Sequence, residues 1–289
     1  GSGKHNNWSM STNTGENLLS PGKKPEENIQ FLLFLTAIIK AVDEYQDLLR
    51  VSVATAGNDN RLGGHEAPPA IVSMFLGDDL EEILNCYETG TEYVPMARQR
   101  METGVAAVPS FRKDTSDRNR TSPFAFTGNR FEFRAVGSSA NCAGAVLALN
   151  AAVAEQLTMF KQEVDALIEK GEAKERALFH VIKRYIKECQ AIHFDGNGYS
   201  EEWKQEAAQR GLDCETNVPV IIDNYLTKET VKMFSRTGVL SPAELQSRCE
   251  VKWENYSLKL QIESRVLGDL VINHVLPAAK RYQKTLLEK

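Results

Sequence analysis

The sequence predicts an α+β protein, in which a few antiparallel strands are packed by helices and followed by an all-helical region. The first observation is the run Arg-Phe-Glu-Phe-Arg at residues 130–134, because strict alternation of polar and apolar residues is typical of a half-buried strand. The second is residues 151–289, where apolar residues recur at helical spacing between glycine, proline and capping signals. We therefore predict two regions, residues 1–150 with the strands and residues 151–289 with helices alone.

The overall composition is that of a globular protein without a preference for nucleic acid. The chain has 289 residues, of which 42% are hydrophobic and 25% charged, and this suffices for one large domain or two ordinary ones. Its formal net charge is -5 and it contains no long basic run. Both features argue against nucleic acid as the main partner.

The sequence also lacks the usual features of membrane and secreted proteins. The longest apolar stretch, residues 31–39, falls short of the roughly 20 residues that span a bilayer. The chain start has no charged segment followed by an apolar one, so we predict no signal peptide. The five cysteines form no Cys-x-x-Cys pair, which favours reduced thiols. We therefore expect a cytoplasmic protein without a membrane partner.

The first half of the chain is predicted to alternate helices and loops. A helix is expected over residues 25–49, because Pro25 and two acids suit a first turn and apolar residues then recur at helical spacing. Residues 51–54 suggest the beginning of a strand. Residues 56–70 contain three glycines and two prolines, which predicts a loop. A short amphipathic helix follows at residues 78–86.

Helices are expected to fill the second half. One runs from residue 140 to 170, with Gly171 as its stop signal. Ser241 opens a capping box with proline at the first helical position, so a long helix starts there and extends to about residue 267. A last helix reaches residue 289 with a bend at Pro277. Further helices are predicted at residues 172–192, 200–210 and 227–237. This half holds no cluster of chemical residues, and we interpret it as a packing and assembly region.

The alternating strand carries the strongest indication of chemistry. Side chains on a strand alternate between faces, so Arg130, Glu132 and Arg134 share one face and two phenylalanines the other. A surface ladder of alternating charge is the ordinary explanation. However, Arg118 and Arg120 precede the strand, and arginine is suited to forked contacts with phosphate and carboxylate. A glutamate among arginines can hold a cation that bridges phosphate oxygens. We interpret this stretch as half of an anionic-substrate site.

Two other segments contain candidate functional residues. The chain start reads Gly-Ser-Gly-Lys-His, which is not a phosphate loop, because the first glycine of that motif is absent and His5 replaces its Ser or Thr. His5 itself can be a metal ligand, a phosphate partner or an ordinary surface histidine. Arg61 and Glu66 lie in the predicted loop, where they are either solvated charges or functional groups positioned by rigid elements.

Taken in order, these motifs resemble glutamine synthetase, and most closely its long bacterial type III branch. The chain start resembles the Asn-Gly-Ser-Gly-x-His segment of the family without its leading Asn, and residues 60–69 resemble the flap around the catalytic glutamate. Residues 118–124 and 129–134 resemble the phosphate-handling loop and the metal-bearing strand. The helical half, including residues 197–203, is similar to the carboxy-terminal extension of the type III branch.

The resemblance implies ligation of ammonia to glutamate with ATP, through a γ-glutamyl phosphate intermediate, with Mg²⁺ or Mn²⁺ as the cofactor. It implies a ring-shaped homo-oligomer whose active sites lie at subunit interfaces. The roles that it implies are metal binding by His5 and Glu132, catalysis by Glu66 and Arg120, nucleotide contacts from Asn7, Ser9 and Arg130, and glutamate contacts from Gly1, Arg61 and Arg134.

The sequence departs from the family in two ways. Asn7 stands where type I members have a histidine, and Thr127 and Ala125 stand where those members have a lysine and an arginine on the nucleotide side. In addition, the other metal-binding glutamates and the amino-terminal β-grasp domain of the family lie upstream of the segment that the chain start resembles. We therefore expect the second half of a catalytic domain, residues 1–150, joined to part of the helical extension, residues 151–289. Two alternatives are a ligase for another amine or acid and a non-catalytic helical assembly module.

Overall fold

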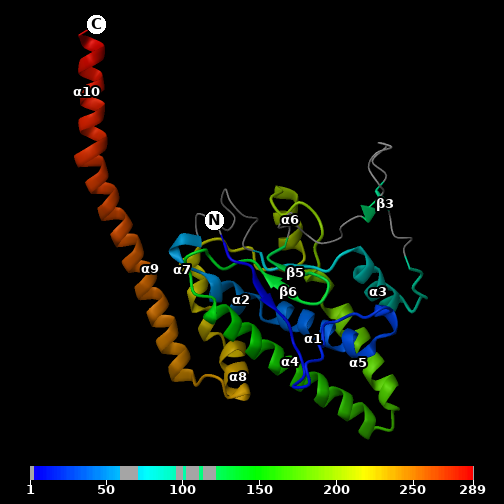
Figure 1. Cartoon of the computed structure of the whole chain (residues 1–289). Helices are drawn as coiled ribbons and strands as arrows, with labels where there is room; N and C mark the ends of the chain where they lie inside the picture. Colours follow the sequence, from blue (N-terminus) through cyan, green and yellow to red (C-terminus); the bar gives the residue numbers. More distant parts are fainter. Residues whose placement is uncertain (1–2, 59–70, 96–99, 102–110, 113–121, 289) are drawn as a thin grey trace.

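Figure 1 shows the computed structural model of the chain, in which helices surround a small sheet and one long helix projects away from the rest. The structure describes residues 3–58, 71–95, 100–101, 111–112 and 122–288. The strands are β1 (Asn6–Trp8), β2 (Met74–Phe75), β3 (Arg100–Met101), β4 (Phe111–Arg112), β5 (Phe124–Phe126) and β6 (Phe131–Phe133).

The helices account for most of the described residues. The α-helices are α1 (Ile29–Glu44), α2 (Gln46–Val53), α3 (Asp78–Thr89), α4 (Ala143–Glu169), α5 (Lys174–Glu188), α6 (Glu201–Gln209), α7 (Val218–Ile221), α8 (Lys228–Thr237), α9 (Pro242–Leu270) and α10 (Leu276–Leu287). Short 3-10 turns are η1 (Pro25–Glu27), η2 (Ala56–Asn58), η3 (Gln190–Ile192) and η4 (Ile222–Leu226), and a π-helical turn, η5 (Val271–Val275), joins α9 to α10.

The main sheet has the strand order β1-β6-β5-β2, and a separate two-stranded sheet pairs β3 with β4. Strand β6 is antiparallel to both β1 and β5, as predicted. Strand β2 is parallel to β5, because the chain passes through α3 before it returns to the sheet. The α+β class is therefore confirmed, with a sheet that is mixed rather than wholly antiparallel.

One face of this sheet forms the centre of the hydrophobic core. Phe131 and Phe133 are almost fully buried, and their rings lie 5.0 Å and 5.6 Å from the ring of Phe124 on the neighbouring strand. Phe31 of α1 packs against Phe126 with ring centroids 5.9 Å apart. Behind the sheet, α1 packs against α4 and α5. The alternation of residues 130–134 thus has the cause inferred from sequence, which is burial of the two phenylalanines.

The region of residues 25–54 differs from its prediction. The helix expected over residues 25–49 is divided into η1, α1 and α2, with the break at Tyr45. The strand suggested at residues 51–54 is wrong, because this segment completes the last turn of α2. Val51 and Val53 are buried there, and packing of α2 against α4 outweighs the β-propensity of the valines.

The predicted helix boundaries agree well where capping chemistry marks them. Gly171 and Gly211 follow α4 and α6 with φ of 94° and 80°, conformations that glycine adopts without strain. Ser200 and Thr227 accept backbone hydrogen bonds as N-caps of α6 and α8. The capping box at Ser241 is present in full. The helix expected at residues 172–192 is shorter, since α5 ends at Glu188 and a 3-10 turn follows.

Among the described residues, helix α9 contacts the rest of the molecule from its beginning to about Glu263. Its buried residues are Leu245 and Cys249, and Trp253 donates a hydrogen bond to Asp223 of η4 at 3.0 Å. Beyond this point η5 and α10 contain no buried residue. Pro277, where we predicted a bend, occupies the first turn of α10, and the irregularity is the wide π turn directly before it.

Helix α4 is a longer apolar segment than the 31–39 run considered from sequence. By length and composition alone it could cross a membrane, with a mean hydropathy of 1.3 in its most apolar window. Half of that window is buried inside the molecule, where α4 packs against α1, α2, α5 and α8. Its apolar character is therefore accounted for by its place in the core.

The division predicted at residue 150 falls inside α4. Residues on both sides of it belong to one continuous hydrophobic core, which includes Phe133, Leu149, Val153 and Phe234. The two-region division stays a prediction.

We expect Phe131→Ala to destabilise the fold by about 3–5 kcal/mol, because it removes a fully buried ring and leaves a cavity between sheet and helices. The measurement is the free energy of unfolding from denaturant titration. Phe179→Ala is the matched control, since the Phe179 side chain is 39% exposed and should cost much less. Equal losses in the two variants would contradict this account of the core.

Candidate active site

The outer face of the sheet brings together the polar side chains of β1 and β6. Asn7 lies directly opposite Glu132 in the antiparallel register. The backbone N–H of Lys4 donates to the carbonyl of Val136 at 2.8 Å, and the bridge from Gly3 to Gly137 continues the pairing with a shift of one residue. The side chains of His5 and Arg134 both approach Glu132. Because side chains alternate along both strands, these four residues share the face away from the core.

Ser9 and Arg130 extend the same face at its other end. The Ser9 hydroxyl donates hydrogen bonds to the side chain of Asn17 at 2.9 Å and to the carbonyl of Asn129 at 3.2 Å. Asn17 donates to the same carbonyl at 2.9 Å. These bonds join segments 120 residues apart in sequence and fix the turn that precedes Arg130, whose side chain is exposed.

The centre of the face is a compact group of one carboxylate, one guanidinium and one imidazole. Arg134 donates from Nε and Nη2 to Oε2 of Glu132, at 3.1 Å and 3.0 Å. The Nδ1 atom of His5 lies 3.5 Å from the same oxygen. The side chains of Arg134 and Glu132 are 6% and 16% exposed, whereas that of His5 is 42% exposed. The charge pair is thus sheltered from water, and the imidazole lies at its open edge.

His5 and Glu132 have the spacing of two ligands of one divalent cation. Ligand atoms about 2.0–2.2 Å from a metal, at tetrahedral or octahedral angles, lie roughly 3.0–3.5 Å from each other. Their donors, an imidazole nitrogen and a carboxylate oxygen, suit Mn²⁺ or Zn²⁺ well and Mg²⁺ through the carboxylate. No group of three candidate metal ligands occurs among the described residues. The described residues therefore fit one side of a metal site.

Four of the predicted site residues, Gly1, Arg61, Glu66 and Arg120, lie outside the described residues. The other six are the residues of the face: His5, Asn7, Ser9, Arg130, Glu132 and Arg134. Their shared orientation follows from the pairing of β1 with β6. No local sequence pattern predicts that these two strands pair.

A buried contact that sequence analysis missed supports the segment before β5. The Ser73 hydroxyl donates to that of Ser122 at 3.1 Å, and Ser122 donates to the carbonyl of Phe194 at 3.3 Å. Both serines are fully buried. This chain of bonds ties β2, the beginning of β5 and the segment after η3 together. Two single serines that lie 49 residues apart in the sequence give no indication of this contact.

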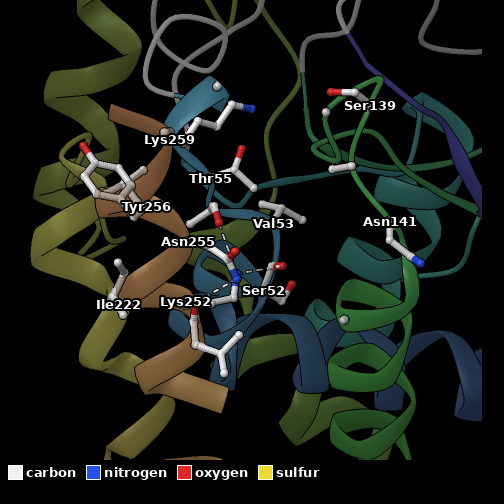
Figure 2. Close-up of a pocket in the computed structure, with 18 of the residues that line it drawn as sticks. Ser52, Val53, Thr55, Ser139, Asn141, Ile222, Lys252, Asn255, Tyr256 and Lys259 are labelled. Carbon is white, nitrogen blue, oxygen red and sulfur yellow. Dashed lines mark hydrogen bonds between the residues drawn. The ribbon is translucent and has the colours of Figure 1, made fainter. Parts of the chain in front are cut away.

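A cavity of about 1400 Å³ opens beyond the end of β6, between the end of α2, the β6–α4 connection, η4 and α9 (Figure 2). Lys252 of α9 reaches into its wall. Its ammonium group donates to the carbonyls of Val51, Ser52 and Ala54, at 2.8, 3.4 and 3.1 Å. The lysine therefore caps the carboxyl end of α2, where unpaired carbonyls and the helix dipole favour a cation.

Lys252 has an unusual acidity for a lysine. Burial, together with the nearby charge of Arg50, lowers the pKa of Lys252 to about 8 from 10.5. Our interpretation of residues 151–289, in which we predicted no cluster of chemical residues, did not anticipate this perturbed lysine. The sequence does not show that Lys252 is buried, because its burial depends on how α2 packs beside α9.

The comparisons with known proteins give consistent results. A family model described as the glutamine synthetase C-terminal domain matches residues 177–289. A "Glutamine synthetase" of Bacteroides fragilis (strain YCH46) is 51% identical over 100% of this chain and 40% of its own length. A "Type-3 glutamine synthetase" of Dictyostelium discoideum is 46% identical over 100% of this chain and 39% of its own length. A "Glutamine synthetase" of Butyrivibrio fibrisolvens is 43% identical over 99% of the chain and 40% of its own length. The chain thus spans about two fifths of the length of these curated relatives.

We expect the stability that depends on Lys252 to rise with pH between about 8 and 10.5. In this interval the folded state has released the Lys252 proton and the unfolded state still holds it, so raising the pH favours folding. The gain is about 3 kcal/mol at most, at roughly 1.4 kcal/mol per pKa unit. It is measured as the difference in unfolding free energy between wild type and Lys252→Met at pH 7 and pH 10.5. Parallel pH profiles of the two proteins would rule out a lowered pKa.

Proposed function

We propose that the complete protein belongs to the glutamine synthetase family and forms glutamine from glutamate, ammonia and ATP, because residues 177–289 match the family's C-terminal domain and the whole chain is similar to curated glutamine synthetases. The observation that carries the proposal is the outer face of the sheet, where His5, Glu132 and Arg134 form a sheltered group of cation-binding and anion-binding side chains. This is the chemistry that phosphoryl transfer to a carboxylate requires.

In the proposed reaction a γ-carboxylate oxygen of glutamate attacks the γ-phosphorus of ATP and displaces ADP. The acyl phosphate so formed is attacked by ammonia at its carbonyl carbon, and inorganic phosphate leaves. His5 and Glu132 would hold a Mg²⁺ or Mn²⁺ ion, which would supply positive charge to offset the negative charge of the phosphate groups. Arg134 keeps the Glu132 carboxylate oriented from one side, and its planar fork is suited to a substrate carboxylate.

The remaining roles belong to the same proposal. Asn7 and Arg130 contact the nucleotide, and Ser9 lies beside ATP and fixes the adjoining turn through its bonds to Asn17 and Asn129. The other members are Gly1 and Arg61 at the glutamate substrate, Arg120 at the transferring phosphoryl group, and Glu66 as the base that takes a proton from ammonium or the tetrahedral intermediate. Exclusion of water around Glu66 would protect the acyl phosphate from hydrolysis.

The proposal extends to assembly and location. Family resemblance supports a ring-shaped homo-oligomer that acts in the cytoplasm, with active sites completed across subunit interfaces. The described residues supply only one side of a metal site, which agrees with further ligands being supplied elsewhere in the complete protein.

We expect Glu132→Gln in the complete protein to lower glutamine formation by at least about a hundredfold, because it weakens a metal ligand and removes the negative charge beside Arg134. The assay measures glutamine and inorganic phosphate released from glutamate, ammonia and ATP. Glu229→Gln, at an exposed position on α8, is the control and should retain wild-type activity. Wild-type activity in Glu132→Gln would refute the proposed site. A wild-type protein that uses another amine in place of ammonia would indicate a related ligase.

A second measurement separates a working nucleotide site from a non-catalytic assembly module. We expect Mn²⁺ with ATP to stabilise the complete protein by about 2.7 kcal/mol when the nucleotide is at a hundred times its dissociation constant. His5→Ala should reduce this stabilisation while leaving the metal-free protein as stable as wild type, because His5 lies at the open edge of the site. Absence of any nucleotide-dependent stabilisation in wild type would favour the assembly module.

A further inference from the structure

Strand β1 is followed by a short hairpin, residues 10–18, which brings Asn17 back beside the sheet. An antiparallel bridge joins Ser11 to Asn17 across the hairpin. Leu19, two residues further on, is fully buried in the hydrophobic core. The backbone of Asn17 is therefore held by the hairpin on one side and by the core on the other.

The side-chain amide of Asn17 connects three segments. Its Oδ1 atom accepts hydrogen bonds from the Ser9 hydroxyl and from the backbone N–H of Leu19, both at 2.9 Å. Its Nδ2 atom donates to the carbonyl of Asn129 at 2.9 Å. These partners fix the orientation of the amide, because a backbone N–H requires an oxygen and a carbonyl requires a donor.

The carbonyl of Asn129 belongs to the tight turn between β5 and β6. The backbone N–H of Thr127 donates to the carbonyl of Arg130 at 2.8 Å, which leaves Gly128 and Asn129 as the two-residue loop. Gly128 has a φ of 88°, a conformation that favours glycine and is common in such loops. Both loop residues are exposed, so the bond from Asn17 holds the turn where packing does not.

The position of this turn determines the direction of the Arg130 side chain. A peptide group is planar, so the carbonyl of Asn129 and the N–H of Arg130 lie in one rigid unit. The Arg130 side chain is exposed and, among the described residues, makes no ion pair. Its orientation therefore depends on its backbone, and a small rotation of the peptide plane moves the guanidinium group much further than it moves Cα.

From these contacts, we propose that Asn17 is a positioning residue for nucleotide binding, which acts on Arg130 through the turn of residues 127–130. The inference rests on the proposed function, in which Arg130 contacts the nucleotide. Without the bond from Asn17 the guanidinium group samples more orientations, and only a fraction of them can contact ATP. The apparent affinity for ATP falls by that fraction. The proposed glutamate contacts come from other segments, so the affinity for glutamate stays the same.

The first test is Asn17→Asp in the complete protein. The carboxylate keeps the bonds from Ser9 and Leu19 but sets an oxygen, with no donor, against the carbonyl of Asn129. We expect the KM for ATP to rise by about tenfold, with kcat changed by less than about threefold and the KM for glutamate unchanged. Isothermal titration with a non-hydrolysable ATP analogue and Mn²⁺ should show the same loss of affinity.

Asn28→Asp is the matched control. Asn28 also joins a loop to a neighbouring element, since its Nδ2 atom donates to the carbonyls of Ser20 and Pro21 at 3.3 Å. Its Oδ1 atom accepts from the backbone N–H of Phe31 at 3.0 Å. The same substitution there removes comparable bonds that do not involve the turn, and we expect the wild-type KM for ATP. Equal increases in the Asn17 and Asn28 variants would overturn the proposal, because they would reflect a general loss of structure.

A double-mutant cycle tests whether Asn17 acts through Arg130. Arg130→Ala should raise the KM for ATP, and adding Asn17→Asp should raise it no further, because two changes to one contact are not additive. Additive effects would overturn the proposal, as would an unchanged KM for ATP in either single variant of an active protein. A wild-type protein that neither forms glutamine nor binds ATP would overturn the proposed function itself, and this inference with it.

Discussion

The pairing of β1 with β6 is the interaction on which the candidate site depends. These two short strands come from distant parts of the chain, and their register decides which side chains face outward. A slip of one residue would turn Glu132 toward the core and Phe131 toward water. Burial of Phe131 and Phe133 against Phe124 opposes that slip. The aromatic core therefore fixes the positions of the imidazole, the carboxylate and the guanidinium on the opposite face.

A second constraint comes from the helical half, which supports the sheet region rather than forming a separate body. Lys252 of α9 closes the carboxyl end of α2, and Trp253 fastens the same helix to η4 through Asp223. Helix α4 is the next element after β6, which bears Glu132, and it continues through the core. Helices that appear from their sequence to serve assembly alone thus also stabilise the end of the sheet beside the cavity.

Sequence reasoning succeeded where the cause of structure is local. Alternation at residues 130–134, the glycines after α4 and α6, and the capping box at Ser241 each act within a few residues, and each was predicted. It failed where packing between distant segments decides the outcome. Val51 and Val53 form part of a helix because α2 packs on α4. Strand β2, which pairs in parallel with β5, has only two residues, too few to show the alternation by which a strand is predicted. For the site, resemblance supplied the residue types, whereas their common face required the β1–β6 register. Burial of Lys252 and the bonds between Ser73 and Ser122 depend on contacts that one sequence does not show.

The distance along the chain between β1 and β6 has a consequence for the order of folding. The bond from Ser9 to Asn129 closes a loop of 120 residues, so this part of the sheet carries a large entropic cost and belongs among the later contacts to form. We therefore expect His5 and Glu132 to come together late in folding, after the intervening helices have formed. A cation held by both residues, as proposed above, would stabilise the closed loop, because its binding energy would add to the stability of the folded state. If the proposed site binds a cation, metal affinity and the completeness of folding would be coupled through a single pair of short strands.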